Sequence, residues 1–416
     1  MKKFLIISTA LILVSAVFFG FGLSHYIKSL PSDELPTTTE TKHHSNKADK
    51  NAHDDTNKDN IPVTPMPSAW QDNGIFSKNY DKAYSYVSKM TKEQLVGQML
   101  VATCPTDGTA EDMLRRYGLG GYIYSVDNFY AKSMDDIKAT ISTHKSGAST
   151  PVFTAVTEEG GAKTTVSDLD AFYEYSFASP RNTFAEGGMD AVKTSEQQKA
   201  QMLSTIGINM NLAPVCDMAE ESNQIMYSRS LGGTVEDTSE YARVSTEAHQ
   251  SKGVSVALKH FPGYGTNLDT YDPVVVDTRD TATFENNDMK PFESGISAGA
   301  HCVMMSNVLV QNLDSTCISS LSKTMHQTLR NTMKYTGLIM TDDLSRTDYS
   351  QYANGKDVYV QAVLSGNDLI MVSSSSVDTA YNNILSALND GTIKLDDLQK
   401  ACTRIIAYKY TVGLMK

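Results

Sequence analysis

Several short apolar runs in this 416-residue sequence end in polar side chains that could do chemistry. These side chains are Glu158 and Glu159, Asp217, Lys259 and His260, Ser306 and Asn307, Asp342 and Asp343, and Ser373. Paired carboxylates can supply a nucleophile and a proton donor around a glycosidic bond, so the set fits the hydrolysis of a sugar. Carboxylates at the strand ends, with Arg229, Lys259 and His260 nearby, suit a neutral polyhydroxylated ligand better than a phosphorylated one.

Other ligand classes have little support. No G-x-x-x-x-G-K-[ST] loop occurs, and the lone Gly263-Tyr264-Gly265 is too weak a pattern to indicate a nucleotide. The formal net charge of −12 argues against a nucleic-acid surface, which needs clustered Lys and Arg. The five cysteines form no C-x-x-C pair, so we expect mostly buried thiols rather than a disulfide framework or a zinc finger. We expect no metal and no cofactor.

The apolar runs resemble buried strands. In chain order they are Gly121–Ser125, Val152–Val156, Ile208–Leu212, Val254–Leu258, Cys302–Met305, Leu338–Met340 and Asp368–Val372. The stretches between them are long enough for helices, and two of them, Ser195–Leu203 and Ala380–Leu388, show helical spacing of apolar residues. This alternation predicts a parallel sheet covered by helices.

Two architectures fit such a pattern, an open doubly wound sheet and a closed barrel. Polar residues from many strand ends can meet at one site only if the strands form a ring, whose active face is the carboxyl end. We therefore predict an α/β fold with a (β/α)₈ TIM-like barrel over residues 69–416. Near its start, residues 91–94 form a capping box, which predicts an amphipathic helix with apolar residues between 95 and 100.

The amino-terminal segment predicts attachment to a membrane. Lys2 and Lys3 precede residues 4–23, an uncharged run long enough to cross a bilayer at about 20 residues. No clear cleavage site or lipid-attachment cysteine follows, which favours an uncleaved signal anchor over a cleaved secretion signal. We expect a cytoplasmic tip and a single transmembrane helix within residues 1–30, and a barrel domain outside the cytoplasm. Residues 31–68 are polar and Pro-containing, which predicts a flexible, disordered linker.

Six stretches carry a family resemblance. In order they are GGYIYSVDNF, AVTEEGGAKTTV, GINMNLAPVCDM, IMYSRSLGG, LKHFPGYGTN and GLIMTDDLS. They resemble the N-terminal barrel domain of glycoside hydrolase family 3, in particular its single-barrel bacterial β-N-acetylglucosaminidase branch. The resemblance extends from about residue 80 to the C-terminus and implies a retaining mechanism.

The resemblance assigns roles to individual residues. It implies that Asp342 is the nucleophile, whereas Asp343 fits better as a helix-capping aspartate. It implies that Arg229, Lys259 and His260 hold hydroxyl groups of the terminal sugar as charge-assisted donors. We also expect the carboxylates Glu159 and Asp217 to belong to the substrate-binding site.

Three positions depart from the family pattern. The family usually has an aspartate where this chain has Thr157, and a histidine where it has Asn307. The branch takes its acid/base from a histidine in an Asp-x-His pair, but here Asp269 is followed by Thr270 and Tyr271. A histidine titrates near pH 6.5 and a tyrosine near 10, so Tyr271 is a poor proton shuttle at neutral pH.

A different group could take over the proton transfer. Asp272, Glu158 or Glu159 could serve as the acid if its pKa were raised. The remaining histidines of the barrel lie outside the matching motif; they are His144, His249, His301 and His326.

Three hypotheses follow. The first is a membrane-anchored, extracytoplasmic, exo-acting glycoside hydrolase that trims β-linked N-acetylhexosamine from cell-wall material, as in peptidoglycan turnover. The second is a catalytically impaired relative that keeps the sugar pocket as a binding or scaffold module at the membrane surface, which the exchanges at Thr157, Tyr271 and Asn307 favour. The third is a hydrolase of altered specificity in which a carboxylic acid replaces the histidine.

Overall fold

Eight parallel strands form one sheet in the computed structural model, which describes residues 64–175, 177–265, 267 and 274–416. In sheet order the strands are β10 (Ile370–Val372), β1 (Leu100–Thr103), β2 (Gly121–Ile123), β3 (Phe153–Val156), β4 (Met210–Asn211), β5 (Ser255–Phe261), β7 (Cys302–Met305) and β9 (Leu338–Thr341). A single parallel bridge between Met340 and Leu369 joins the two end strands, so the ring is nearly closed. This arrangement is consistent with the predicted TIM-like barrel.

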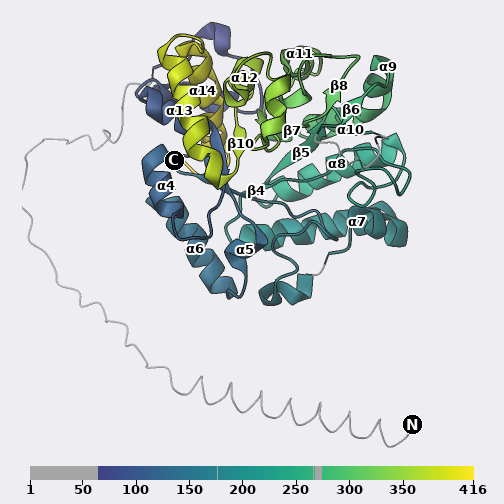
Figure 1. The fold of residues 1–416 in the computed structure, drawn as a ribbon. Helices are drawn as coiled ribbons and strands as arrows, with labels where there is room; N and C mark the ends of the chain where they lie inside the picture. The colour runs from purple at the N-terminus through teal and green to yellow at the C-terminus, as the bar shows by residue number, and fades with distance from the viewer. Residues whose placement is uncertain (1–63, 176, 266, 268–273) are drawn as a thin grey trace, which may run out of the picture. The chain divides into compact units, whose positions relative to one another are not determined.

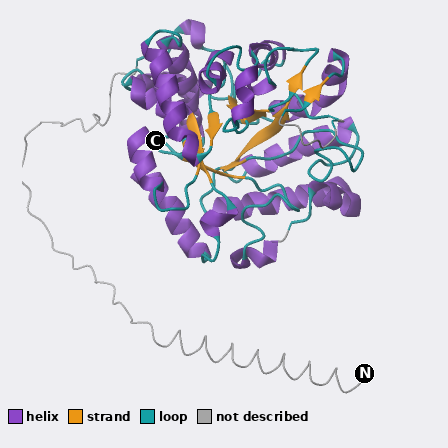
Figure 2. Cartoon of the chain, in the orientation of Figure 1, coloured by secondary structure: helices purple, strands orange, loops and turns teal. Residues whose placement is uncertain are grey.

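Helices surround the strands, which lie in the interior (Figures 1 and 2). The helices between consecutive strands are α4 (Ala110–Tyr117), α5 (Val126–Phe129), α6 (Met134–Gly147), α7 (Pro180–Thr205), α8 (Val235–Gln250), α9 (Thr281–Thr283), α10 (Lys290–Ser297), α11 (Lys323–Gln327) and α12 (Val358–Ser365). Before the first strand come α2 (Tyr80–Val87) and α3 (Lys92–Met99), and after the last come α13 (Val377–Asn389) and α14 (Leu395–Thr411). The predicted helical stretches 195–203 and 380–388 lie in α7 and α13.

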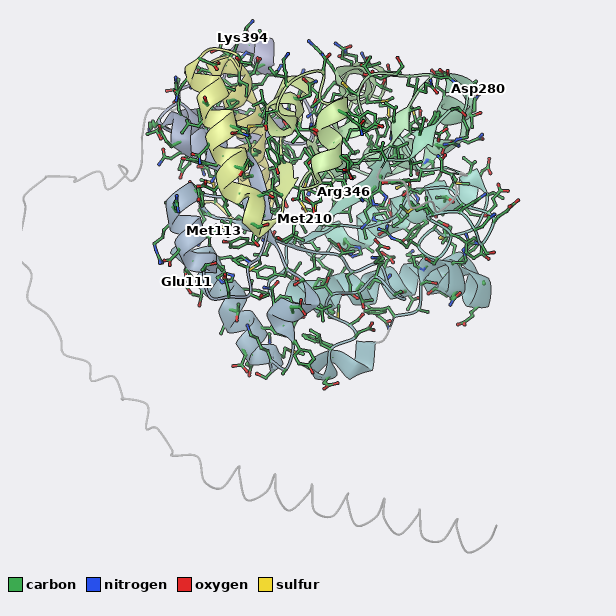
Figure 3. All side chains as sticks on the ribbon, viewed as in Figure 1. Glu111, Met113, Met210, Asp280, Arg346 and Lys394 are labelled. Carbon is green, nitrogen blue, oxygen red and sulfur yellow. The ribbon has the colours of Figure 1, made fainter. Side chains whose placement is uncertain are left out.

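The strands are short and buried on both faces, as expected for a parallel sheet covered by helices. All seven residues of β5 are buried, including Lys259 and His260 near its carboxyl end. Met210 of β4 is likewise fully buried in the interior of the barrel, whereas Asp280 lies at the molecular surface (Figure 3). The sheet therefore presents polar groups mainly where its strands end.

One of the eight barrel strands, β1, was missing from the sequence-based prediction. Leu100 was expected on the apolar face of a helix, but α3 ends at Met99 and Leu100 is extended, with φ −87° and ψ 128°. Leu100 pairs with Ile370 of β10, and Val101 with Gly121 of β2. The error arose because helix and strand are adjacent in one apolar run with no turn residue between them. The predicted capping box is present, since Thr91 and Gln94 bond each other's backbone N–H.

Several predictions concern residues beyond the described ones. The expected transmembrane helix at residues 4–23 and most of the linker at 31–68 lie outside them, so the proposed division of the chain stays a prediction. None of the helices within residues 64–416 combines the length and the apolar character of a membrane span. All five cysteines are buried and free, as predicted.

Gly97 of α3 provides a test of the packing between this helix and α4. A Cβ atom at Gly97 would lie 1.8 Å from the carbonyl oxygen of Tyr117, which is backbone and cannot rotate away. We predict that Gly97→Ala lowers the free energy of unfolding by roughly 3 kcal/mol through overpacking. Urea unfolding followed by circular dichroism measures this change.

Gly147 at the end of α6 is the matched control. A Cβ atom there would meet nothing within 4 Å. Gly147→Ala should leave the free energy of unfolding unchanged or raise it by about 0.5 kcal/mol, because alanine restricts the unfolded chain. Equal destabilisation by the two substitutions would contradict the packing seen at Gly97.

Candidate active site

The predicted site residues lie at the carboxyl ends of neighbouring strands. Thr157, Glu158 and Glu159 follow β3, and Asp217 lies beyond β4. Lys259 and His260 are the fifth and sixth residues of β5, Asn307 follows β7 and Asp342 follows β9. This is the end of a parallel barrel at which catalytic groups are found.

Glu159 is the centre of a buried ion-pair network. Its carboxylate accepts two hydrogen bonds from Arg229, with Nε 2.9 Å from Oε2 and Nη2 2.7 Å from Oε1. The ammonium group of Lys259 lies 2.6 Å from the same Oε1. The side chains of Glu159 and Lys259 are 1% and 3% exposed. Burial alone would raise the pKa of Glu159, but Lys259 and Arg229 lower it to about 2.

A second buried pair on α7 fixes the backbone of Glu159. Lys199 Nζ donates to the carbonyl oxygen of Glu159 and to the carboxylate of Glu196, at 2.7 Å in both cases. Ser245 of α8 donates to the other oxygen of Glu196 at 2.7 Å. Sequence reasoning missed these residues. The available signal was that Glu196 and Lys199 occur within a stretch whose apolar residues predicted a buried helical face.

Asp217 positions the loop after β5. It accepts hydrogen bonds from His260 Nδ1 at 2.7 Å, from the backbone N–H of His260 at 3.2 Å and from that of Tyr264 at 2.9 Å. Because Nδ1 donates to the carboxylate, Nε2 of His260 is left for another partner. Asp217 and Glu159 are both 1% exposed and hold basic side chains in place. Their direct contact with a substrate stays a prediction.

Arg229 is held by a loop that depends on α7. Arg181, at the start of that helix, donates to the carbonyl oxygens of Tyr227 at 2.8 Å and Ala219 at 2.6 Å, and to Ser230 Oγ at 2.9 Å. Its guanidinium lies 3.9 Å from the centre of the Tyr227 ring. A Cβ atom at Gly232 (φ +78°) would meet this guanidinium, so the loop requires glycine there. Sequence reasoning did not identify Arg181.

Asp342 is the carboxylate that remains available in this group. Its backbone N–H donates to the carbonyl oxygen of Met305 at 3.1 Å, which fixes it against β7. Within the described part of the chain it forms no ion pair, and its side chain accepts from the backbone N–H of Asp343 at 2.8 Å. Burial lowers the pKa of Lys259, and the charge of Asp342 opposes that shift. Asp342 therefore acts electrostatically on the ammonium group that Glu159 holds.

Asp343 and Asn307 stabilise the turn that follows Asp342. Asp343 Oδ1 accepts from Ser345 N–H at 2.9 Å and from Ser345 Oγ at 2.6 Å, so it caps a turn rather than the helix we expected. Asn307 donates to the carbonyl oxygen of Asp343 at 2.9 Å and accepts from Ser320 Oγ at 2.5 Å. Asn307 thus connects the ends of β7 and β9.

Glu158 is engaged by a loop of its own. Its carboxylate accepts from the backbone N–H groups of Thr165 at 3.0 Å and Val166 at 2.8 Å, and from the hydroxyl of Ser167. Burial raises the pKa of Glu158, against these hydrogen bonds. Because both oxygens are occupied, Glu158 cannot serve as the replacement acid without releasing residues 165–167.

Comparison with known proteins identifies the family. The model of the glycosyl hydrolase family 3 N-terminal domain matches residues 91–408. The chain belongs to glycoside hydrolase family 3. This is a family of O-glycosyl hydrolases. The chain is 27% identical over 287 residues to a β-hexosaminidase of Xanthomonas oryzae pv. oryzae, a match that covers 66% of this chain and 83% of that protein. A β-hexosaminidase of Xylella fastidiosa is 26% identical over 59% of this chain and 74% of its own.

Solved structures of family 3 share the fold. A glycoside hydrolase family 3 β-N-acetylglucosaminidase from Paenibacillus sp. str. FPU-7 superposes with a TM-score of 0.72 and 24% identity, covering 78% of this chain. This chain spans 63% of that protein. A β-N-acetylhexosaminidase from Beutenbergia cavernae gives a TM-score of 0.69 and 22% identity, covering 77% of this chain and 99% of its own. The predicted resemblance to family 3 is confirmed.

The family 3 acid/base position lies outside the described residues, because it falls in the segment 268–273 that contains Asp269, Tyr271 and Asp272. Residues on both sides of this segment make side-chain hydrogen bonds and ion pairs. Asn267 Nδ2 donates to Asp277 at 2.6 Å, and Arg279 binds the carboxylates of Asp277 and Asp288 at 2.8 to 3.1 Å. Asn267 and Asp277, which lie on either side of this segment, are therefore bonded to each other.

No histidine in residues 64–265 or 274–416, apart from His260, is placed to replace the family 3 acid/base. His144 bonds the Tyr124 hydroxyl at 2.8 Å, and His249 bonds the carbonyl oxygen of Ser245 at 3.0 Å. His301 bonds Ser255 Oγ at 2.8 Å, and His326 Nδ1 bonds the carbonyl oxygen of Ser322 at 2.7 Å. Burial lowers the pKa of each of these four imidazoles, so they are neutral core residues.

Glu159 is predicted to be the main determinant of stability at this site. Glu159→Gln removes the carboxylate and leaves Lys259 and Arg229 buried beside each other. We expect a loss of roughly 3–5 kcal/mol in the free energy of unfolding at pH 7. Chemical unfolding of both proteins over a range of pH measures it.

The pH dependence has a defined sign. The pKa of Glu159 is lowered from 4.5 to about 2 in the folded protein. The ionised carboxylate therefore makes its full contribution to the free energy of unfolding above pH 4.5, and this contribution is lost as the pH falls toward 2. The difference between wild type and variant should stay constant from pH 7 to 5 and narrow below pH 4.5. As a control, Glu247→Gln removes the exposed partner of Arg243 and should cost less than about 1 kcal/mol. If the difference in the free energy of unfolding between wild type and Glu159→Gln grew as the pH fell, the lowered pKa of Glu159 would be contradicted.

Proposed function

We propose that this family 3 protein is an exo-acting, retaining glycoside hydrolase that removes a terminal β-linked N-acetylhexosamine. One observation carries the proposal. Asp342 lies without an ion-pair partner among the described residues, within electrostatic range of the Lys259 and Arg229 that Glu159 holds. The names of the relatives, β-hexosaminidase and β-N-acetylglucosaminidase, support the choice of sugar.

In this mechanism Asp342 attacks the anomeric carbon as the glycosidic oxygen departs with a proton. A covalent glycosyl–Asp342 ester forms and water then hydrolyses it, so the configuration at the anomeric carbon is retained. Lys259, Arg229 and Nε2 of His260 would donate to hydroxyl groups of the sugar. Because Glu159 and Asp217 already fix these donors, little ordering is required when the sugar binds.

Neither Glu158 nor Glu159 fits the role of the proton donor. Glu159 has a pKa of about 2 and would be ionised at neutral pH, and Glu158 is engaged by its loop. We propose that the segment 268–273 supplies the acid, through Asp272 or through Tyr271. Loss of acid–base catalysis typically costs about 10²- to 10⁴-fold in rate, and less with a good leaving group.

A catalytically impaired sugar-binding protein is the second candidate function. The position of Asn307 favours it, because this residue replaces a family histidine and both polar ends of its side chain are used within the protein. Together with Thr157 and Tyr271, this leaves three positions of the family pattern without their usual side chains.

We predict that the full chain, purified in a nonionic detergent, hydrolyses an aryl β-N-acetylglucosaminide. Asp342→Asn should lower kcat by roughly 10⁴-fold or more because it removes the nucleophile. Asp343→Asn, one residue further on, is the matched control and should keep most of the activity, since the turn it caps tolerates an amide. Proton NMR of the first product should show the β-anomer.

Tyr271→His separates the two candidate functions. A wild-type protein that is active, with an inactive Asp342→Asn variant, supports the hydrolase. If the wild type is inactive and Tyr271→His gains turnover with a bell-shaped pH profile, the result supports the sugar-binding protein instead of the hydrolase. Release of the α-anomer would rule out retention.

We also propose that residues 4–23 anchor the protein in the cell membrane, with the barrel domain outside the cytoplasm and acting on cell-wall glycan fragments. The prediction is that the protein sediments with membranes and resists extraction at high salt and alkaline pH. Protease added to intact spheroplasts should remove the barrel domain. Recovery of a mature protein that begins after about residue 24 would refute the anchor.

A further inference from the structure

A cavity of about 470 Å³ opens at the amino end of the barrel, away from Asp342. Its lining includes residues that precede strands: Thr336 before β9, Asp368 before β10 and Met99 before β1. The catalytic carboxylate follows β9, so the barrel lies between the two sites. The cavity volume falls within the roughly 300–1,000 Å³ typical of small-molecule sites.

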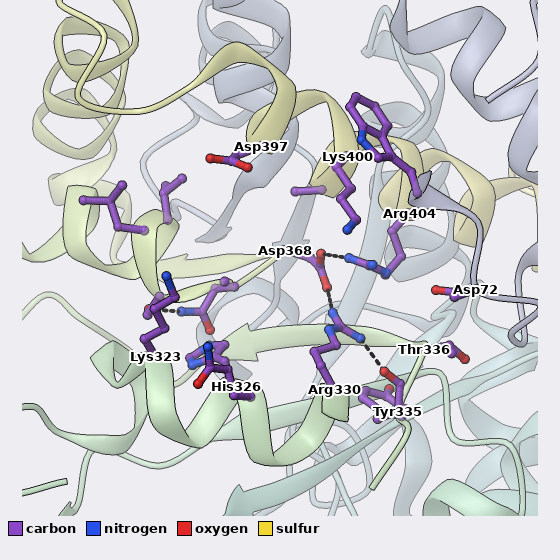
Figure 4. A pocket seen from close by; sticks show the side chains of 18 of the residues that line it. Asp72, Lys323, His326, Arg330, Tyr335, Thr336, Asp368, Asp397, Lys400 and Arg404 are labelled. Atoms are coloured by element: carbon purple, nitrogen blue, oxygen red, sulfur yellow. Dashed lines mark hydrogen bonds and ion pairs between the residues drawn. The ribbon is translucent and has the colours of Figure 1, made fainter. Parts of the chain in front are cut away.

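The cavity has an excess of buried positive charge. Asp368, 1% exposed, is bound by Arg404 Nη1 at 2.5 Å and by Arg330 Nη2 at 2.7 Å (Figure 4). Asp368 is thus the ion-pair partner of both guanidinium groups. Lys400 lies on α14, one turn before Arg404, and its side chain extends toward this group (Figure 4). Lys400 has no ion pair within the described part of the chain. The lining carries four basic side chains, Lys323, Arg330, Lys400 and Arg404, against the three carboxylates of Asp72, Asp368 and Asp397.

The acidic side chains of the lining do not fully balance this charge, because Asp72, Asp368 and Asp397 leave an excess of one positive charge. The carboxylate of Asp72 accepts from the Tyr80 hydroxyl at 3.0 and 3.1 Å and from the N–H of Gly74 at 2.9 Å. Burial, then Arg404 and Arg330, lower the pKa of Lys400, and the charges of Asp72 and Asp368 oppose this shift. An anion in the cavity would relieve the repulsion between Lys400 and these arginines.

Unused hydrogen-bonding capacity points to the same place. Arg404 Nε is buried and has no hydrogen-bond partner among the described residues. His326 Nε2 and Asn367 Oδ1 also line the cavity and also lack a well-aligned partner, although these two side chains interact with each other. Buried polar atoms are normally satisfied, so Arg404 Nε is a donor that lacks its usual partner; a ligand would reach it once the side chains that cover it move aside.

We propose that this cavity binds a small organic oxyanion, a phosphate monoester or a carboxylate. The anionic group lies between Lys400 and Arg404, where a point charge and an unused N–H donor meet. The organic part contacts the apolar lining, which includes Trp70, Met99 and Ile393. The site is separate from the sugar site, so it stands whether or not the proposed hydrolase activity is found.

The test uses the full chain in nonionic detergent at a constant ionic strength of about 0.15 M. Isothermal titration calorimetry measures binding of phenyl phosphate, benzoate and inorganic phosphate. We expect saturable binding of phenyl phosphate or benzoate, which identifies the preferred anionic group, and at least tenfold weaker binding of inorganic phosphate. If inorganic phosphate bound as tightly as both organic probes, the proposal that the ligand has an organic part would be wrong.

Lys400→Met is the decisive variant, because it removes the charge and keeps most of the aliphatic stem. It should weaken binding of the organic probe at least tenfold while melting at the same temperature as wild type or higher, since a like charge is removed. Lys394→Met, in an exposed position just before α14 and outside the cavity lining, is the matched control and should bind as wild type does (Figure 3). Equal binding by the Lys400 variant, or no saturable binding by wild type, would overturn the proposal.

Discussion

A single buried carboxylate determines the geometry of the candidate active site. Glu159 binds Lys259 from β5 and Arg229 from the loop before α8, and its backbone is in turn held by Lys199 of α7. The network joins three βα units across about 100 residues of sequence, from Glu159 to Lys259. Ionised groups in such a place are costly unless paired, so each member depends on the others. The site is therefore assembled by the fold before any sugar arrives.

At each end of the barrel a buried carboxylate binds two basic side chains, but the surrounding charges differ. At the carboxyl end, Arg229 and Lys259 bind Glu159, and two further carboxylates, Asp217 and Asp342, act on Arg229. At the amino end, Arg330 and Arg404 both bind Asp368, and the basic side chains of the cavity lining outnumber the acidic ones by one. The carboxylate-rich end suits an uncharged ligand, whereas the amino end suits a ligand that brings its own negative charge.

The fold and the main site residues could be predicted because the signals are local. Apolar runs followed by polar groups indicate strand ends, and seven of the eight strands of the barrel were found in this way. β1 was missed because Leu100 continues an apolar helix without a turn residue. The roles of Arg181, Lys199 and Glu158 depend on loops and helices distant in sequence, so no spacing rule reveals them. Asp269 and Tyr271 fall outside the described residues, and their roles remain predictions.

The ion pairs of Arg279 bear on how such a site can change during evolution. Asp277, Arg279 and Asp288 fasten the chain on one side of residues 268–273, and Asn267 ties the other side to the same carboxylate. These ion pairs lie outside positions 268–273, so an exchange within those positions leaves their partners in place. Under the proposed mechanism, the proton donor could therefore change in a lineage independently of the residues that would hold the sugar.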